Sequence, residues 1–129
     1  MLVEVSDAVR TPDGVSVVCR VPFGQARMRW CGDPSVSAGS FHVEWTINVN
    51  ADWGRNSWFS AVAQPGLWMA AGVVVFRARL RGPAELADLE FGDSLVLLEF
   101  DGPVPAEAWN SWIELRVPSD QVEIYPYNL

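Results

Sequence analysis

Apolar and polar residues alternate along much of this chain, a pattern typical of β-strands that bury one face. In the clearest run, Phe41 to Val49, every odd-numbered residue is apolar and every even-numbered residue is polar. Successive side chains of a strand point to opposite faces of the sheet. The run therefore predicts a strand whose core-facing side chains are Phe41, Val43, Trp45, Ile47 and Val49.

Six further segments alternate in the same way or are rich in residues that favour strands. They are Leu2–Val9, Val15–Val21, Val73–Leu80, Leu95–Phe100, Trp112–Val117 and Gln121–Tyr125. Clusters of Gly, Pro, Asp and Ser, which form turns, separate most of these segments. About seven short strands divided by turns predict an all-β fold.

Two stretches are candidates for short helical turns. Residues 82–89 place Pro83 where a helix can begin, with acidic residues in the first two turns. Residues 57–64 end before Pro65-Gly66, but Trp58, Ser60 and Val62 also alternate as they would in a strand. The pattern leaves helix and strand open for residues 57–64.

The order of these elements favours a small Greek-key barrel similar to the oligonucleotide-binding (OB) kind, with a β-sandwich as the alternative. A connection of about 22 residues, 50–71, divides the strands, and OB-like barrels often carry a helix in a long connection. We expect residues 1–129 to form one such domain, because the length suits a single core and no linker or repeat interrupts it.

The charge of the chain is unevenly distributed. The formal net charge is −7, yet residues 1–81 carry eight arginines against six acids, whereas residues 82–129 carry ten acids and only Arg116. An acidic C-terminal third favours a basic protein partner through electrostatic steering. The net charge argues against a protein that coats duplex DNA. All nine basic residues are arginine, which indicates a GC-rich, bacterial coding bias.

Several classes of protein find no support in the sequence. No apolar run reaches the roughly 18 residues of a membrane helix, and acids occupy the N-terminus where an export signal needs a basic flank, so we expect a cytoplasmic protein without a membrane partner. Cys19 and Cys31 are expected to be free thiols. Together with His42 they lack the spacing of a zinc site, so we predict no metal and no cofactor.

Catalysis would have to use His42, the only histidine. Glu44 follows two residues later on the same predicted face and would be placed to orient the imidazole. No phosphate-binding loop, dinucleotide-binding loop or hydrolase motif is present. A small enzyme centred on His42 is therefore the third of three hypotheses.

Tryptophan is abundant, with seven in the chain. The expected core tryptophans are Trp30, Trp45 and Trp112. Trp53, Trp58 and Trp68 lie in the long connection near Arg55, and tryptophan with arginine is typical of binding hot spots. The alternative for Trp58 and Trp68 is that they close one end of the barrel.

Arg77, Arg79 and Arg81 alternate along one strand and would form a row on one face. Arginines beside tryptophans are the components of a platform for single-stranded nucleic acid. Alternatively, cross-strand pairs with Glu44, Glu99 or Glu114 hold the row, and the sequence favours this pairing.

We therefore expect a non-catalytic binding module for a basic protein, immunity-like, antitoxin-like or regulatory. The candidate binding residues are Trp53, Arg55, Trp58, Trp68, Glu85, Asp88, Glu90 and Asp93. The alternative is an OB-like barrel that binds a small ligand or a short single strand of nucleic acid through the Trp/Arg loop or through Arg77, Arg79 and Arg81.

Overall fold

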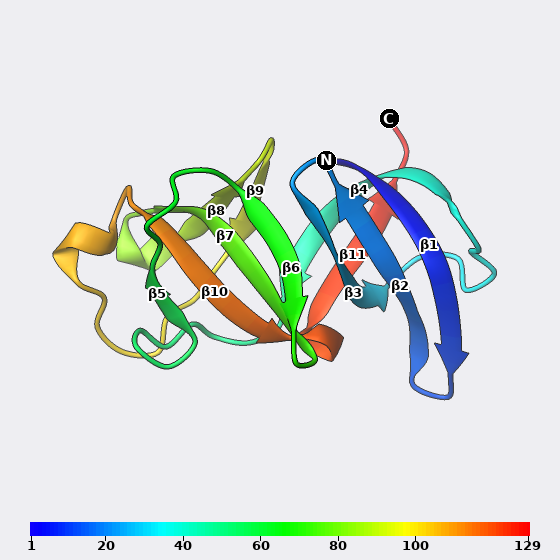
Figure 1. The fold of residues 1–129 in the computed structure, drawn as a ribbon, viewed down its shortest axis with the longest axis horizontal. Helices are drawn as coiled ribbons and strands as arrows, with labels where there is room; N and C mark the ends of the chain where they lie inside the picture. Colours follow the sequence, from blue (N-terminus) through cyan, green and yellow to red (C-terminus); the bar gives the residue numbers. More distant parts are fainter.

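The computed structural model describes all residues 1–129 and consists of eleven strands and three single 3-10 turns (Figure 1). The strands are β1 (Leu2–Thr11), β2 (Gly14–Val21), β3 (Gly24–Trp30), β4 (Gly39–Ile47), β5 (Ser57–Phe59), β6 (Gly66–Ala70), β7 (Val73–Arg81), β8 (Asp88–Phe91), β9 (Ser94–Leu97), β10 (Trp112–Pro118) and β11 (Val122–Tyr127). The turns are η1 (Ala84–Leu86), η2 (Ala106–Ala108) and η3 (Ser119–Gln121). None of the helical turns is long or apolar enough to cross a membrane. The expected all-β fold is confirmed.

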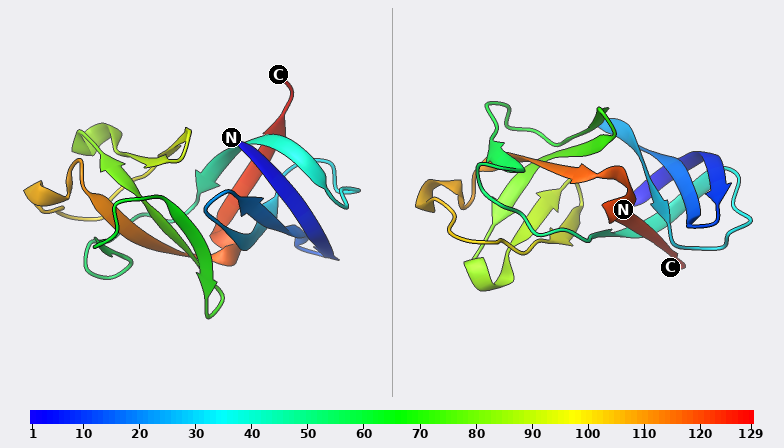
Figure 2. Two further views of the ribbon diagram at one scale, coloured as in Figure 1. Left: turned by 45° about the horizontal axis from the view of Figure 1, so that its top comes forward. Right: turned by 90° about the horizontal axis from the view of Figure 1, so that it is seen from below.

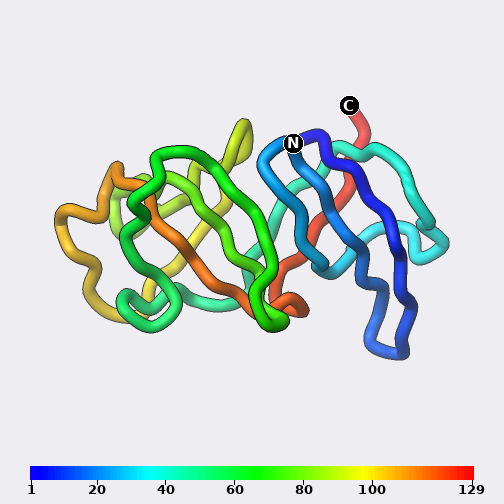
Figure 3. Tube along the Cα trace, in the orientation of Figure 1, coloured from blue at the N-terminus to red at the C-terminus, as the bar shows by residue number.

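Five of the strands form a closed barrel, on the right in Figure 1. Their order is β11-β4-β1-β2-β3, and β11 closes the ring by pairing in parallel with β3. The neighbours β4-β1-β2-β3 have the spatial order of a Greek key. Both chain ends lie on this barrel (Figure 3). The fold is thus a barrel rather than the alternative sandwich.

The chain between β4 and β11 folds into a second sheet, on the left in Figure 1 and in both views of Figure 2. The strand order is β6-β7-β10-β5, and the β8–β9 hairpin continues from the C-terminal end of β7. Residues 50–71 contribute β5 and β6 to this sheet. The helix that OB-like barrels often carry is therefore absent from this connection.

The barrel and the second sheet meet backbone to backbone at the turn between β2 and β3. Gly24 pairs in parallel with Leu67 of β6, and the Leu67 amide donates to the Phe23 carbonyl at 3.2 Å. Gly24 has a φ of +144°, and a Cβ atom there would lie 1.8 Å from the Leu67 carbonyl oxygen. Only glycine allows the two strands to approach so closely.

A cluster of aromatic rings forms the second contact between the two parts. The Trp45 ring of β4 packs edge-on against Phe91 at 5.5 Å and Phe76 at 6.1 Å, and Phe91 also contacts Phe23 at 4.9 Å. These rings belong to one continuous cluster of buried residues that includes strands of both parts. Edge-to-face packing of this kind is favourable beyond the area it buries.

The predicted core face of β4 is confirmed. Val43 and Trp45 are buried, while Phe41, Ile47 and Val49 are partly buried and pack against the core. The regular strand ends at Ile47, two residues before the end of the alternating pattern. Trp30 is buried as expected, and Trp112 is only half-buried because it lies on the outer face of β10.

Three segments differ from the sequence-based expectation or complete it. The short helical stretch expected over 82–89 is confined to the single turn η1, and β8 follows because Leu89 and Phe91 are buried where β8 pairs with β7 and β9. Residues 57–59 form a strand, which answers the question left open there. Strand β3 was not expected, although Ala26 and Met28 alternate with arginines along it.

The close approach at Gly24 leads to a stability prediction. Substitution Gly24→Ala is expected to reduce the free energy of unfolding by at least about 3 kcal/mol, because the new methyl group would overlap a backbone carbonyl that cannot move independently. Gly102→Ala is the control: its φ is +87° but nothing lies within 4 Å, so about 1 kcal/mol is expected. Urea unfolding measures both losses, and equal losses would contradict the proposed constraint.

Candidate functional site

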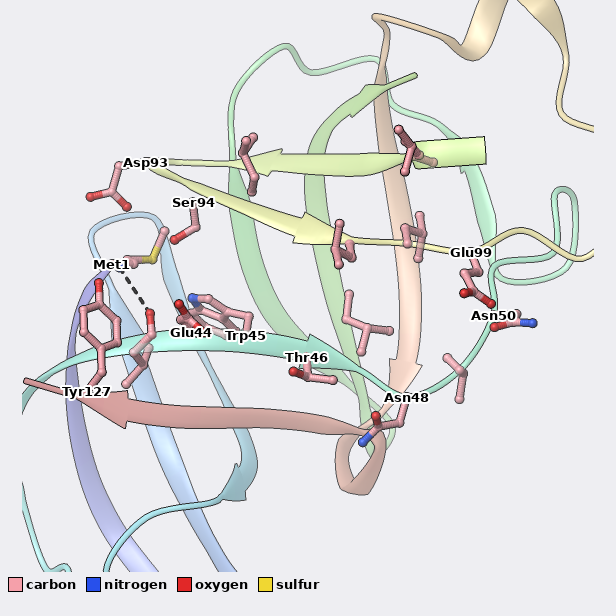
Figure 4. A pocket seen from close by; sticks show the side chains of 18 of the residues that line it. Met1, Glu44, Trp45, Thr46, Asn48, Asn50, Asp93, Ser94, Glu99 and Tyr127 are labelled. Carbon is pink, nitrogen blue, oxygen red and sulfur yellow. Dashed lines mark hydrogen bonds between the residues drawn. The ribbon is translucent and has the colours of Figure 1, made fainter. Parts of the chain in front are cut away.

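A cleft of about 810 Å³ lies between β4 of the barrel and the β8–β9 hairpin with its preceding turn η1 (Figure 4). Its volume is in the range of sites that hold small molecules or cofactors. One wall comes from β4 and the residues that follow it, and the other from β9 and η1. The cleft therefore lies where the barrel meets the second sheet.

The charged side chains that line the cleft are all acidic. They are Glu44, Glu85, Asp93 and Glu99, and no arginine or histidine joins them. None of these four carboxylates takes part in an ion pair. The α-ammonium of Met1 is the one cationic group at the cleft, and it donates to the Val43 carbonyl at 3.2 Å. A concave surface on which carboxylates outnumber cations attracts cationic groups.

Exposed leucines accompany these acids. Leu86, Leu95 and Leu97 line the cleft and are 73%, 57% and 76% exposed. Large apolar side chains that gather at one exposed place are typical of interaction surfaces. The cleft therefore combines negative charge with apolar contact area.

Trp45 contributes an unsatisfied hydrogen-bond donor to the cleft. The residue is only 7% exposed, and its indole Nε1 has no hydrogen-bond partner. Figure 4 shows the indole among the residues that line the cleft, beside Glu44. A buried donor without an acceptor costs about 1–3 kcal/mol, and because the nitrogen has almost no exposed surface, an occupant of the cleft does not reach it unless the side chain moves.

The four acids expected from the sequence divide into two pairs. Glu85 and Asp93 line the cleft. Asp88 and Glu90 lie instead on β8 beside Arg81, whose guanidinium nitrogens are 3.9 Å and 3.4 Å from their carboxylate oxygens. The sequence analysis did not select Glu44 and Glu99 as cleft residues, and only their positions on or next to strands could have suggested them.

The two residues expected to anchor a partner, Trp53 and Arg55, lie outside the cleft. Trp53 is half-buried, packs against the core and contacts Phe59 edge-on at 4.9 Å. The Arg55 side chain is 83% exposed and lies 3.5 Å from the carboxylate of Asp52.

Trp58 and Trp68 lie on the outer face of the second sheet and do not close a barrel end. Cross-strand pairing places them on this face with other tryptophans and arginines. We call this surface the Trp/Arg face, and it consists of Trp58, Trp68, Arg77, Arg79, Trp112 and Arg116. The Arg116 guanidinium lies 5.2 Å from the Trp58 ring, and that of Arg77 lies 5.3 Å from the Trp68 ring.

Of the acids expected to pair with the arginine row, Glu114 is the cross-strand neighbour of Arg77, but neither Glu114 nor Glu44 nor Glu99 forms an ion pair with the row. Arg77 donates to the Gln64 carbonyl at 2.8 Å and Arg79 to the Asn110 carbonyl at 3.3 Å, while Arg81 pairs with the acids of β8. Arg77 extends over Gly66, its cross-strand neighbour, towards Trp68. Arg77, Arg79 and Arg116 therefore have no carboxylate within 4 Å.

His42 and the cysteines take no part in the cleft. His42 is half-buried on β4 with its ring 6.0 Å from that of Tyr127, and no hydrogen bond joins it to Glu44. Both cysteines are free, and burial raises the pKa of Cys19 to about 12. No group of three or more His, Cys, Asp or Glu side chains is arranged to hold a metal ion.

A polar network that the sequence did not reveal surrounds Glu123 on β11. Its carboxylate accepts hydrogen bonds from Asn48 at 2.5 Å, from Tyr125 at 3.1 Å and from the Cys31 thiol at 3.5 Å. The hydrogen bond from Asn48 is the largest cause that lowers the pKa of Glu123. The network connects the ends of β3 and β4 to β11 and so reinforces the closure of the barrel.

Comparisons with protein-family models, curated proteins and solved structures give no match to this chain.

The Glu123 network leads to a pH prediction. The folded state holds the pKa of Glu123 below its ordinary value of 4.5, so its contribution to stability is complete above that value and is lost as the pH falls through the folded pKa. The free energy of unfolding, measured in urea at pH 7 and about pH 3, should fall less in Glu123→Gln than in the wild type. Glu107→Gln, which changes an exposed side chain without hydrogen bonds, should retain the wild-type fall.

Proposed function

We propose that this chain is a non-catalytic binding module that holds a basic protein partner in the acidic cleft between β4 and the β8–β9 hairpin. The observation that carries the proposal is the set of four unpaired carboxylates in a cleft without a basic side chain. A cationic partner would be steered towards the carboxylates and would gain contact area from the leucines.

The proposal extends to the kind of module. A cationic partner such as a nuclease toxin would make this an immunity-like, antitoxin-like or regulatory protein of the bacterial cytoplasm. We also propose that the barrel is OB-like, which its five closed strands and their Greek-key order support. In this barrel the large insertion follows β4 and forms the second sheet of the same domain.

A second candidate function is the binding of single-stranded nucleic acid on the Trp/Arg face. The specific observation is that three arginines without an ion pair lie among three tryptophans on one sheet face, where Glu114, between Trp58 and Arg77, is the one acid that the register adds. Rings that stack on bases and cations that follow the backbone are the two components of such platforms. A small ligand finds less support, because Trp58 and Trp68 are separated by β10 and β7 and do not converge with Trp53 on one pocket.

Charge reversal in the cleft tests the first proposal. The probe is a labelled decapeptide of alternating Arg and Val, blocked at both ends. Replacing Glu44, Glu85 and Asp93 together by lysine should weaken its binding by about tenfold or more, because the attraction becomes repulsion. The matched control replaces three acids outside the cleft, Asp13, Glu107 and Asp120, by lysine. Fluorescence anisotropy measures both, and equal losses would show that only net charge matters.

Binding of a short labelled oligothymidylate tests the second candidate. Arg77→Glu should weaken binding by about tenfold or more, and Trp58→Ala should remove about 1–3 kcal/mol, the usual contribution of one stacked base. Arg55→Glu makes the same charge change on an exposed loop and should have a much smaller effect. Equal effects of the two arginine substitutions would exclude the Trp/Arg face as the platform.

A further inference from the structure

The acidic cleft contains the edges of two strands that form no ladder with each other. Just beyond these strands the chain closes one end of the cleft, where the Ala51 amide donates to the Glu99 carbonyl and the Asp101 amide to the Ala51 carbonyl, both at 2.7 Å. Strand β9 pairs only with β8, so its other edge is free. Strand β4 pairs with β11 on one side from His42 to Ile47, but its pairing with β1 on the other side ends at His42. The edges of β4 and β9 lie next to each other along the cleft without forming a ladder.

The hydrogen bonds of β9 show which of its backbone groups point away from β8. The Leu98 amide donates to the Ala87 carbonyl at 3.0 Å. The N–H and C=O groups of successive residues point to opposite edges of a strand. The groups of the even-numbered residues of β9 therefore point towards β8. Leu95 and Leu97 therefore direct their N–H and C=O groups away from the hairpin and towards the free edge.

The same reasoning applies to β4. The Asn48 amide donates to Gln121 of the β11 side at 2.9 Å, whereas the Val43 amide donates to Met1 of the β1 side at 2.9 Å. The N–H and C=O groups of the odd-numbered residues of β4 thus point away from β11. Beyond the last pair with β1, the N–H and C=O groups of Trp45 and Ile47 point to the side of β9, with which they form no hydrogen bond.

An unprotected strand edge is a template for another strand. Proteins commonly block such an edge with a charged residue or a proline, but β9 has the sequence Ser-Leu-Val-Leu and contains neither. Its two outward leucines are among the most exposed apolar residues of the chain.

We propose that an extended basic segment of the protein partner binds in the cleft as an added β-strand along the free edge of β9. The inference rests on the proposed function and specifies how the partner binds. In an extended segment, side chains alternate between two faces. Cationic side chains on one face would meet Glu44, Glu85 and Asp93, and apolar side chains on the other would cover Leu95 and Leu97.

Backbone methylation of the probe separates strand addition from simple charge attraction. Two further versions of the alternating Arg-Val decapeptide carry N-methyl groups either on every Arg or on every Val, so charge and side chains stay the same. Because N–H groups of neighbouring residues point to opposite edges, one of the two sets must face β9. Methylation of that set should weaken binding by about tenfold or more, since several hydrogen bonds are lost.

A proline substitution makes the corresponding test on the protein. Leu95→Pro removes an N–H group that points to the free edge, where proline is tolerated within a sheet. Leu95→Ala shortens the same side chain but keeps the N–H group, so it is the matched control. Leu95→Pro should weaken binding of the unmethylated peptide clearly more than Leu95→Ala does. If the proline variant does not fold, as judged by circular dichroism, the methylated peptides decide.

The outcomes distinguish this inference from the proposed function. If all three peptides bind equally well but the lysine triple variant of the cleft does not bind, the partner site stands and strand addition is wrong. If the triple variant binds as well as its control variant, the proposed function and this inference both fail. Failure of the unmethylated peptide to bind the wild type also overturns both.

Discussion

The contact of Trp45 with Phe76 and Phe91 holds the barrel and the second sheet together, and the cleft depends on it. Phe91 ends β8 and contacts three other rings, those of Phe23, Trp45 and Phe76. This packing fixes the β8–β9 hairpin beside β4, so the cleft has two defined walls. The Trp45 side chain has two roles, because its ring belongs to the joint and the residue also lines the cleft.

The same joint separates two surfaces of opposite character. Along β7, Phe76 points inwards to the aromatic contact, while Arg77 and Arg79 point outwards onto the Trp/Arg face. The acids of the cleft gather on the side of the hairpin, where no arginine reaches them. A chain with a formal net charge of −7 thus keeps a face with unpaired cations. The geometry of a strand creates this division, because successive side chains point to opposite faces of the sheet.

The sequence predicted those features that local patterns determine. The core face of β4 was predictable because the opposite face of the strand meets solvent, so apolar and polar residues alternate strictly along it. Residues 82–89 carry the local signals of a helix start, but pairing of β8 with β7 and β9 overrides them. The cleft was not predictable for a similar reason. Glu44 and Asp93 meet only through the aromatic joint, and the register that places Arg81 opposite Asp88 decides which acids are paired and which are free.

The free edge of β9 would ordinarily favour pairing with a second copy of the chain. Here the cleft opposes that outcome, because any copy that brings its own β9 hairpin also brings Glu85 and Asp93 towards carboxylates of the same sign. A basic strand meets no such repulsion. The negative charge of the acids therefore has two effects: it keeps identical edges apart, and it selects a cationic segment for the edge where backbone groups lack partners.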